Sequence, residues 1–237
     1  MRINKYLMQY EIGARRKIDN LISEKRVSVN GKIAELGQDV TDSDIILIDG
    51  IAVKKDVIKK VYYIFNKPKN VICSSTDPRG RKTVLDVLKV KERVFSIGRL
   101  DYDTEGLLIF TNDGDIFNKM IHPKSKVEKT YKVEINSPIT KKEIEKIEKG
   151  VMIDDEKTFP AKVELIDHHK NPKIFRLKIT QGRNRQVKKM MKAIGKIVVE
   201  LKREKIGNLD LGDLKTGEYC KISRKKIESF VFGVGRK

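Results

Sequence analysis

Residues 98–115 read GRLDYDTEGLLIFTNDGD, and this stretch leads from a polar loop into an apolar run. The run LLIF, residues 107–110, is typical of a buried strand. Asp101 stands where the loop becomes that strand, so we expect its carboxylate at the wall of a cleft. Arg99 precedes it by two residues, and a cationic partner would keep the carboxylate ionised.

Four further acids share this stretch, and we predict two different roles for them. Asp113 and Asp115 are predicted to form the turn that ends the strand, because aspartate favours turns. Asp103 and Glu105 are predicted to be solvated acids of the loop.

A calcium loop is the first chemistry that such a cluster of acids suggests. Asp101, Asp103, Glu105 and Gly106 match the pattern D-x-[DN]-x-[DN]-G apart from the glutamate. The twelfth position of a calcium loop needs a bidentate glutamate, and here it is Asn112. The calcium hypothesis therefore fails.

Two other chemistries remain, a glycosidase carboxylate pair and a single aspartate nucleophile. The glycosidase hypothesis is weak because sugar sites recruit aromatic platforms, whereas this chain has no tryptophan and 6% aromatic residues. The remaining interpretation makes Asp101 a nucleophile in a basic cleft. A structural Arg–Asp pair is the alternative that the pattern alone leaves open.

The charge of the chain indicates a polyanionic partner. The formal net charge is +19, and residues 173–205 hold twelve basic residues against two acids. The first 32 residues hold eight basic residues against three acids. Because the charge is focused in two segments, it favours a nucleic-acid-binding surface over a general compositional bias.

Cysteine, histidine and hydropathy patterns limit the other function classes. Cys73 and Cys220 lie far apart outside any CxxC pattern, so we expect reduced structural thiols. His168 and His169 stand in a polar turn without a third ligand, so no metal site is predicted. No stretch approaches the ~20 apolar residues of a membrane span, and no signal peptide is seen. We expect a cytoplasmic monomer without membrane contact.

Residues 1–60 are predicted to form a separate module. Apolar spacing predicts two short helices, and VNGK and IDGI predict two hairpins around Asn30-Gly31 and Asp49-Gly50. The pattern resembles the αL RNA-binding module named after a small-subunit ribosomal protein, although Ala14 replaces the usual serine. This resemblance implies that RNA is bound by the module's polar residues Arg2, Lys5, Arg15, Arg16, Lys17, Lys25, Arg26, Asn30 and Lys32.

Residues 61–237 are predicted to form an α+β domain on a largely antiparallel mixed sheet with flanking helices. Strands are expected at 61–65, 107–110 and 131–135, and a hairpin of two alternating strands at 161–180. Helices are expected within 139–151 and 186–195. The connections look short and hairpin-like, which favours an antiparallel arrangement.

Three ordered motifs resemble the RsuA-type pseudouridine synthases. They are GRLDYDTEGLLIFTNDGD, KTYKVEI (129–135) and QGRNRQVKKMMKAIGKIVVELKREKIG (181–207). The resemblance implies a pseudouridine synthase fold with a central cleft for residues 61–237. It also implies isomerisation of a uridine in ribosomal RNA without cofactor or metal. GRNRQV is closest to the RluB-type branch, which acts on large-subunit RNA.

The resemblance also implies roles for single residues. Asp101 either attacks the nucleoside or aids removal of a sugar proton, Tyr131 stacks on the flipped uracil, and Lys188 pairs with Asp101. The residues expected to bind the substrate are Arg99, Leu201, Arg183 and Arg185. Two alternatives stay open, namely a small-subunit RNA target and a non-catalytic ribosome-assembly factor.

Overall fold

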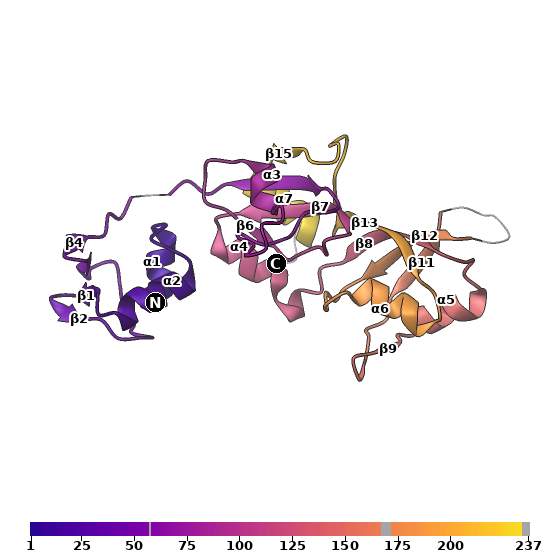
Figure 1. Ribbon diagram of the computed structural model, residues 1–237, viewed down its shortest axis with the longest axis horizontal. Coiled ribbons are helices and arrows are strands. Elements are labelled where there is room, and N and C mark those ends of the chain that lie inside the picture. Colours follow the sequence, from indigo (N-terminus) through magenta and orange to yellow (C-terminus); the bar gives the residue numbers. More distant parts are fainter. Residues whose placement is uncertain (57, 167–171, 234–237) are drawn as a thin grey trace. The chain divides into compact units, whose positions relative to one another are not determined.

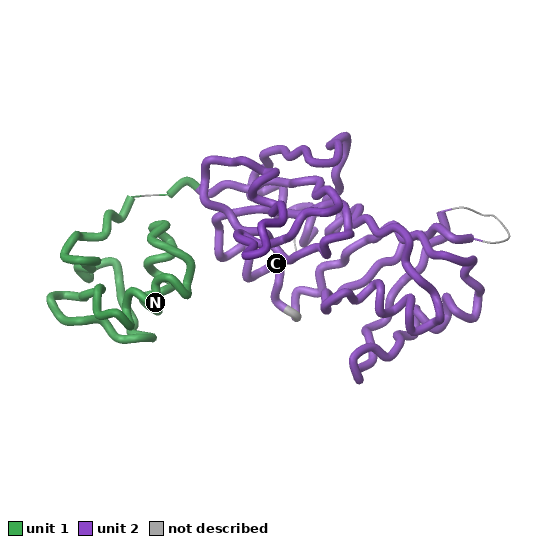
Figure 2. The backbone as a smooth tube through the Cα atoms, in the orientation of Figure 1, with its two compact units in different colours: residues 1–59 green, residues 60–237 purple. Residues whose placement is uncertain are grey.

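The computed structural model describes residues 1–56, 58–166 and 172–233, so the predicted turn with His168 and His169 lies outside the described residues. The chain divides into two compact units, residues 1–59 and 60–237 (Figure 2). The break falls between Lys59 and Lys60, close to the predicted boundary. None of the helices in the described ranges is both long and apolar enough to cross a membrane.

The first unit combines two helices with a small sheet around one apolar core (Figure 1). Its sheet has the strand order β2-β1-β3-β4. The bounds are α1 Ile3–Gln9, α2 Arg15–Ser23, β1 Val27–Val29, β2 Lys32–Ile33, β3 Ile46–Ile48 and β4 Ile51–Ala52.

Local sequence explains both hairpins of this unit. Asn30 and Gly31 have φ values of 51° and 80°, and Asp49 and Gly50 have 51° and 78°. Two consecutive left-handed residues make the type I′ turn that suits the twist of paired strands. The predicted helices and hairpins are present, and Ile33 in β2 is 56% exposed.

The second unit is built on a mixed sheet that has nine strands within the described residues. Its path runs β11-β12-β8-β13-β7-β5-β15, with β14 on β13 and β6 on β7, and only β13 and β7 are parallel. The bounds are β5 Tyr62–Lys67, β6 Phe95–Ile97, β7 Glu105–Thr111, β8 Lys129–Ile135, β11 Lys162–Leu165, β12 Ile174–Ile179, β13 Val198–Ile206, β14 Leu209–Asp210 and β15 Tyr219–Lys221.

Helices and a small ribbon accompany this sheet (Figure 1). The bounds are α3 Val84–Leu88, α4 Gly114–Ile121, the 3-10 turn η1 Pro123–Ser125, α5 Lys141–Glu148, α6 Gln186–Ala193 and α7 Arg224–Phe232, with the ribbon β9 Met152–Ile153 and β10 Glu156–Lys157. The α+β organisation on a largely antiparallel mixed sheet agrees with the prediction. Helices α3, α4 and α7 were not predicted.

The unbroken apolar run of β7 reflects burial on both of its faces. Leu107 and Ile109 pack into the core cluster that contains residues of α4 and α7. Leu108 and Phe110 pack into the cluster that contains residues of α3. Because successive strand residues point to opposite faces, a strand covered on both sides needs apolar residues at every position.

The two halves of the sheet meet where β7 runs beside β13. Lys202 pairs with Glu105 and Arg203 pairs with Gly106 in this parallel contact. Gly106 has φ of 120°, and a Cβ placed on it would lie 2.3 Å from the backbone oxygen of Arg203. The two strands can approach this closely only because position 106 has no side chain.

The segment after β7 is not the simple turn that we predicted. Asp113 is the N-cap of α4, and its side chain accepts a hydrogen bond from the backbone N–H of Asp115. Its carboxylate is only 1% exposed, with the Tyr62 hydroxyl donating at 2.6 Å and Arg224 Nη1 at 3.2 Å. A buried carboxylate needs such partners, so Asp113 joins the helices α4 and α7 to β5.

Glu105 also departs from its predicted role as a solvated loop acid. It is the first residue of β7, it is half-buried, and its carboxylate lies 2.7 Å from Lys202 Nζ. The strand therefore begins two residues earlier than the apolar run indicates, because cross-strand pairing extends beyond the buried residues.

The Asp113 network predicts a pH-dependent stability. Burial alone would raise the pKa of Asp113, but the Tyr62 hydrogen bond, the Asp115 amide and the Arg224 charge hold that pKa below its usual range. We expect Asp113→Asn to lower the free energy of unfolding by about 1–3 kcal/mol at pH 7. Denaturant unfolding of both proteins, followed by circular dichroism, measures the difference.

The sign of this effect follows from linkage. A carboxyl whose folded pKa lies below the unfolded value of about 3.9 stabilises the fold above that pH. The contribution is lost as the pH falls through the folded pKa. The difference in the free energy of unfolding between wild type and Asp113→Asn should therefore become smaller below about pH 4. A difference that stays constant down to pH 3 would contradict this account.

Candidate active site

The loop that carries Asp101 connects β6 to β7 and is held from the end of β5. Lys67, the last residue of β5, donates from Nζ to the carbonyl oxygens of Asp101 at 3.1 Å and Thr104 at 2.9 Å. The Thr104 amide also donates to the Asp101 carbonyl at 3.1 Å, which closes a turn. The backbone of Asp101 is thus fixed from two directions.

Lys67 is fully buried and holds the Asp101 loop in place, a role that the sequence did not reveal. Burial lowers the pKa of its ammonium group, and a third hydrogen bond goes to the Pro68 carbonyl at 2.9 Å. Three carbonyl acceptors satisfy the three donors of a lysine. Its place just after the apolar residues of β5 was the available signal, but the strand was predicted to end at residue 65.

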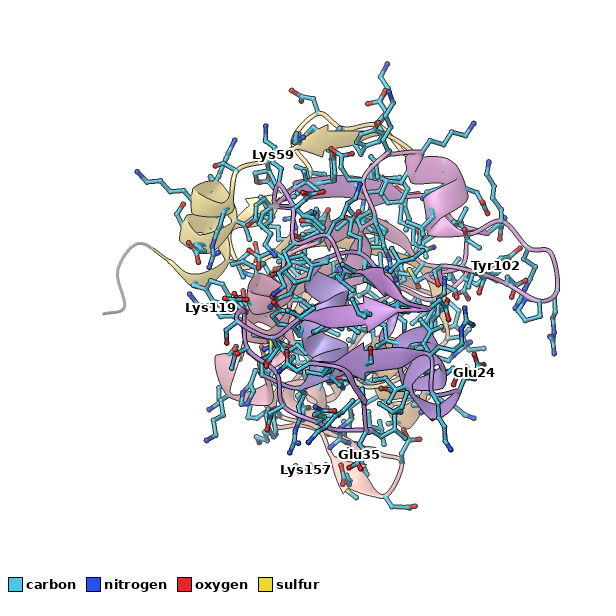
Figure 3. All side chains as sticks on the ribbon, turned by 90° about the vertical axis from the view of Figure 1, so that its left-hand side faces the viewer. Glu24, Glu35, Lys59, Tyr102, Lys119 and Lys157 are labelled. Carbon is cyan, nitrogen blue, oxygen red and sulfur yellow. The ribbon has the colours of Figure 1, made fainter. Side chains whose placement is uncertain are left out.

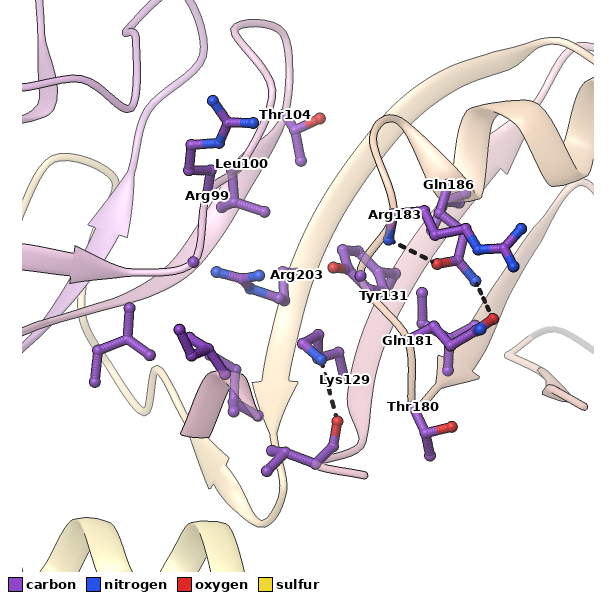
Figure 4. A pocket seen from close by; sticks show the side chains of 18 of the residues that line it. Arg99, Leu100, Thr104, Lys129, Tyr131, Thr180, Gln181, Arg183, Gln186 and Arg203 are labelled. Atoms are coloured by element: carbon purple, nitrogen blue, oxygen red, sulfur yellow. Dashed lines mark hydrogen bonds between the residues drawn. The ribbon is translucent and has the colours of Figure 1, made fainter. Parts of the chain in front are cut away.

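A pocket of about 510 Å³ opens beside this loop (Figure 4). Its walls come from the 98–104 loop, from β8 and β13, and from the segment between β12 and α6. Six of the seven residues predicted for catalysis and substrate binding line it, namely Arg99, Asp101, Tyr131, Arg183, Arg185 and Leu201. The volume lies within the range of small-ligand pockets.

Lys188, the seventh predicted residue, contacts the pocket through Asp101. It projects from α6, and its Nζ lies 3.9 Å from Asp101 Oδ2. Its shorter contact is a hydrogen bond to Asp103. Lys188 therefore lies between two carboxylates, whereas the sequence predicted a pair with Asp101 alone.

Asp103 is correspondingly not a free loop acid. Burial would raise its pKa, but the hydrogen bond and charge of Lys188 outweigh burial and lower the pKa of this carboxyl. Asp101 differs, because its carboxylate accepts no hydrogen bond from another described residue. Tyr102, between the two acids, is 45% exposed on the outside of the unit (Figure 3).

Tyr131 and Leu201 supply the apolar wall of the pocket. Tyr131 lies on β8 and is 8% exposed, and Leu201 lies on β13 and is 5% exposed. Cross-strand pairing aligns Tyr131 with Arg203 and Leu201 with Val133. Strand periodicity puts Leu201 and Arg203 on one face, so a ring and an aliphatic side chain stand beside a guanidinium.

The three predicted arginines at the pocket differ in their exposure and in their contacts. Arg99 and Arg185 are exposed, and Arg185 has φ of 51° as the N-cap of α6. Arg183 is half-buried and its Nη2 lies 2.5 Å from a Glu156 oxygen. The side chains of Arg99 and Arg185 form no ion pair or hydrogen bond with a described residue.

Three further cations that line the pocket, Lys126, Lys129 and Arg203, were not predicted as site residues. Arg203 is 3% exposed and lines the pocket, although it counted toward the basic surface segment 173–205. Lys129 also lines the pocket, and burial together with the Arg203 charge lowers its pKa to about 8. Alternation with Leu201 along β13 was the sequence signal for Arg203.

The nine residues predicted to bind RNA in the first unit are all exposed. Arg2 contacts Asp39 and Arg26 contacts Asp49, while the Asn30 amide bonds to Asp44. The other six, Lys5, Arg15, Arg16, Lys17, Lys25 and Lys32, form no side-chain ion pair or hydrogen bond with a described residue.

Within the described residues, no group of three or more histidine, cysteine, aspartate or glutamate side chains is arranged to hold a metal ion. Cys73 is half-buried and Cys220 is exposed, and both are free thiols.

Comparison with known proteins supports a shared ancestry over the whole chain. Residues 61–193 match the family model described as RNA pseudouridylate synthase, and residues 1–46 match the S4 domain. The chain is 41% identical to ribosomal large subunit pseudouridine synthase B of Bacillus subtilis, covering 96% of this chain and 94% of the relative. It is 36% identical to an uncharacterized RNA pseudouridine synthase of Aquifex aeolicus, covering 100% and 96%.

A solved structure gives the same result for the fold. The crystal structure of a pseudouridylate synthase aligns with a TM-score of 0.71 at 30% identity, covering 98% of this chain and all of that one. The predicted fold and the resemblance to RsuA-type enzymes are thereby confirmed. The chain belongs to the RNA pseudouridylate synthase family, with an S4 domain at its N-terminus.

Proposed function

We propose that this enzyme isomerises one uridine of large-subunit ribosomal RNA to pseudouridine. The observation that carries the proposal is the charge of the pocket, in which Asp101 is the one carboxylate lining it among the described residues. Six cationic side chains line the same pocket, namely Arg99, Lys126, Lys129, Arg183, Arg185 and Arg203. Such a site suits a polyanionic substrate and a reaction that uses one ionised acid. The similarity to large-subunit enzymes supports the choice of RNA.

The substrate base has to leave its stack before it can react. A flipped base is held by stacking on an aromatic ring, and extrusion costs a few kcal/mol. Tyr131 supplies the ring and Leu201 an apolar surface beside it. The exposed cations Arg99 and Arg185 bind phosphates along the RNA and offset the cost of extrusion.

The reaction conserves all atoms. The N1–C1′ bond breaks, the uracil turns, and a C5–C1′ bond forms, while the C5 proton leaves and N1 gains one. Asp101 serves this sequence as a nucleophile toward the ribose or as a base toward a sugar proton, and both roles need an ionised carboxylate. Lys188 Nζ lies 3.9 Å from Asp101 Oδ2 and supplies a positive charge beside that carboxylate.

The N-terminal unit contributes general affinity for RNA. Arg15, Arg16 and Lys17 begin α2 without an acidic neighbour in its first turn. Cations at a helix N-terminus oppose the helix dipole, so they do not serve the stability of the helix. We assign them to phosphate contacts, which makes binding depend strongly on salt.

The proposal predicts that the purified chain releases tritium from large-subunit RNA labelled at uracil C5. Release follows because the C5 proton is lost when C5 bonds to C1′. We expect one uridine to be modified, and mapping of carbodiimide-dependent reverse-transcription stops identifies it. Small-subunit RNA, labelled in the same way, is the matched substrate control.

Two outcomes separate the alternatives. Release from small-subunit RNA alone would keep the isomerase and reject the large-subunit target. RNA binding without any release would favour a non-catalytic assembly factor.

In a triple variant, Arg15→Gln, Arg16→Gln and Lys17→Gln, the salt dependence of binding should become weaker while turnover at saturating RNA is kept.

A further inference from the structure

Arg203 is a buried cation that has no counter-charge among the described residues. Its side chain comes from the centre of β13, and its Nε donates to the Leu107 carbonyl at 2.7 Å. The Nη2 atom is buried and has no hydrogen-bond partner among the described residues. No described carboxylate forms an ion pair with this guanidinium.

The positive charge of Arg203 also acts on two neighbouring lysines. The Arg203 charge contributes to the lowered pKa values of both Lys67 and Lys129, with burial the larger cause in each case. Lys67 is satisfied by three carbonyl groups. Lys129 has one hydrogen bond, to the Val127 carbonyl at 3.2 Å.

Neither Arg203 nor Lys129 has a carboxylate partner among the described residues, and both border the same space. Arg203 and Lys129 line one pocket, and Figure 4 shows the Arg203 guanidinium pointing into the space between Arg99 and Lys129. A buried charge is strongly destabilising unless it is paired. Two cations that repel each other in a binding pocket therefore indicate that a ligand supplies the missing negative charge.

We propose that Arg203 and Lys129 form an anion subsite that binds a phosphodiester group of the nucleotide entering the pocket. The inference rests on the proposed function for the identity of the ligand as RNA. It adds a specific phosphate contact inside the pocket to the general electrostatic attraction at its rim. The guanidinium and the ammonium group together can donate to two phosphate oxygens.

A uracil carbonyl fits this subsite less well than a phosphate. A neutral oxygen would accept a hydrogen bond from Arg203 but would leave both positive charges uncompensated. Tyr131 and Leu201 already offer the base an apolar surface. In a nucleotide, the phosphate is the group that carries a negative charge.

The side-chain Nε–H resonance of Arg203 tests the subsite without any assay of activity. Its hydrogen bond to Leu107 protects this proton, so it should be visible by 1H–15N NMR and missing in Arg203→Met. We expect inorganic phosphate and uridine 5′-monophosphate to shift it in a saturable way, and chloride or uridine to leave it in place. Lys129→Met should raise the phosphate concentration needed at least about tenfold.

Turnover provides the second measurement. Loss of a charge-assisted contact predicts that Arg203→Met and Lys129→Met each lower kcat/KM by about 10- to 100-fold. Arg203→Lys keeps the charge and should recover part of this loss. Lys132→Met is the matched control, because Lys132 is an exposed residue of β8 that does not line the pocket.

The outcomes distinguish this subsite from the proposed function. An active enzyme whose Arg203 resonance ignores phosphate and uridine 5′-monophosphate would refute the subsite and keep the isomerase. A shift caused equally by uridine would assign Arg203 to the base and also refute it. A phosphate-dependent shift in a chain that releases no tritium would keep the anion subsite and reject the isomerase.

Discussion

Asp101→Asn should remove tritium release from labelled ribosomal RNA while RNA affinity stays close to that of the wild type. The amide has the size of the carboxylate but is neither a nucleophile nor a base, so we expect kcat to fall by about 10⁴-fold or more. Folding should be unaffected, because the Asp101 carboxylate accepts no hydrogen bond from another described residue. Single-turnover kinetics and filter binding measure the two quantities.

Asp103→Asn is the matched control for this substitution. Asp103 is also an acid of the loop and also contacts Lys188, but it does not line the pocket. Its loss leaves Lys188 with Asp101 as its carboxylate partner, so we expect a decrease of less than about tenfold. If Asp101→Asn retained turnover and Asp103→Asn lost it, the nucleophile would have been assigned to the wrong acid.

The position of Asp101 could be predicted because it depends on local sequence. The apolar run of β7 marks a strand buried on both faces, and the residues just before it form the loop at the mouth of the pocket. Hairpins at Asn30-Gly31 and Asp49-Gly50 were predictable for the same reason, since the turn residues alone determine their backbone geometry.

The buried cations were missed because their burial depends on distant segments. Lys67 follows an apolar strand, but only the carbonyl groups of the 98–104 loop make its burial possible. Arg203 stands in a basic segment that looks like exposed surface, yet it lies under the junction with β7. Pairing between remote strands leaves no signal in the composition of either one.

Helix α4 was missed for a related reason. Its first residues, after Asn112-Asp113, have the composition of a turn, and the helix has only eight residues. Asp113 prefers the N-cap position because Tyr62 and Arg224 satisfy its second oxygen. Those partners come from β5 and α7, far away in the sequence.

Gly106 links the fold to the site, because it lies between Lys67 and Arg203 in the sheet. On one side it pairs with the strand that anchors the Asp101 loop, and on the other with the strand that carries Leu201 and Arg203. The apposition of these strands sets the distance between the carboxylate wall and the apolar wall of the pocket. A larger residue at position 106 would change both the sheet and the site.

Gly106→Ala is therefore expected to destabilise the second unit by about 3 kcal/mol or more, or to prevent its folding. The new Cβ would lie 2.3 Å from the Arg203 oxygen and 2.7 Å from its nitrogen, and φ of 120° is unfavourable for alanine. Urea unfolding measures the loss, with Gly114→Ala as control, since a Cβ there meets no atom within 4 Å. Equal stability of the two variants would show that β7 and β13 can move apart without a loss of free energy of unfolding. The pairing of these strands would then not fix the walls of the pocket.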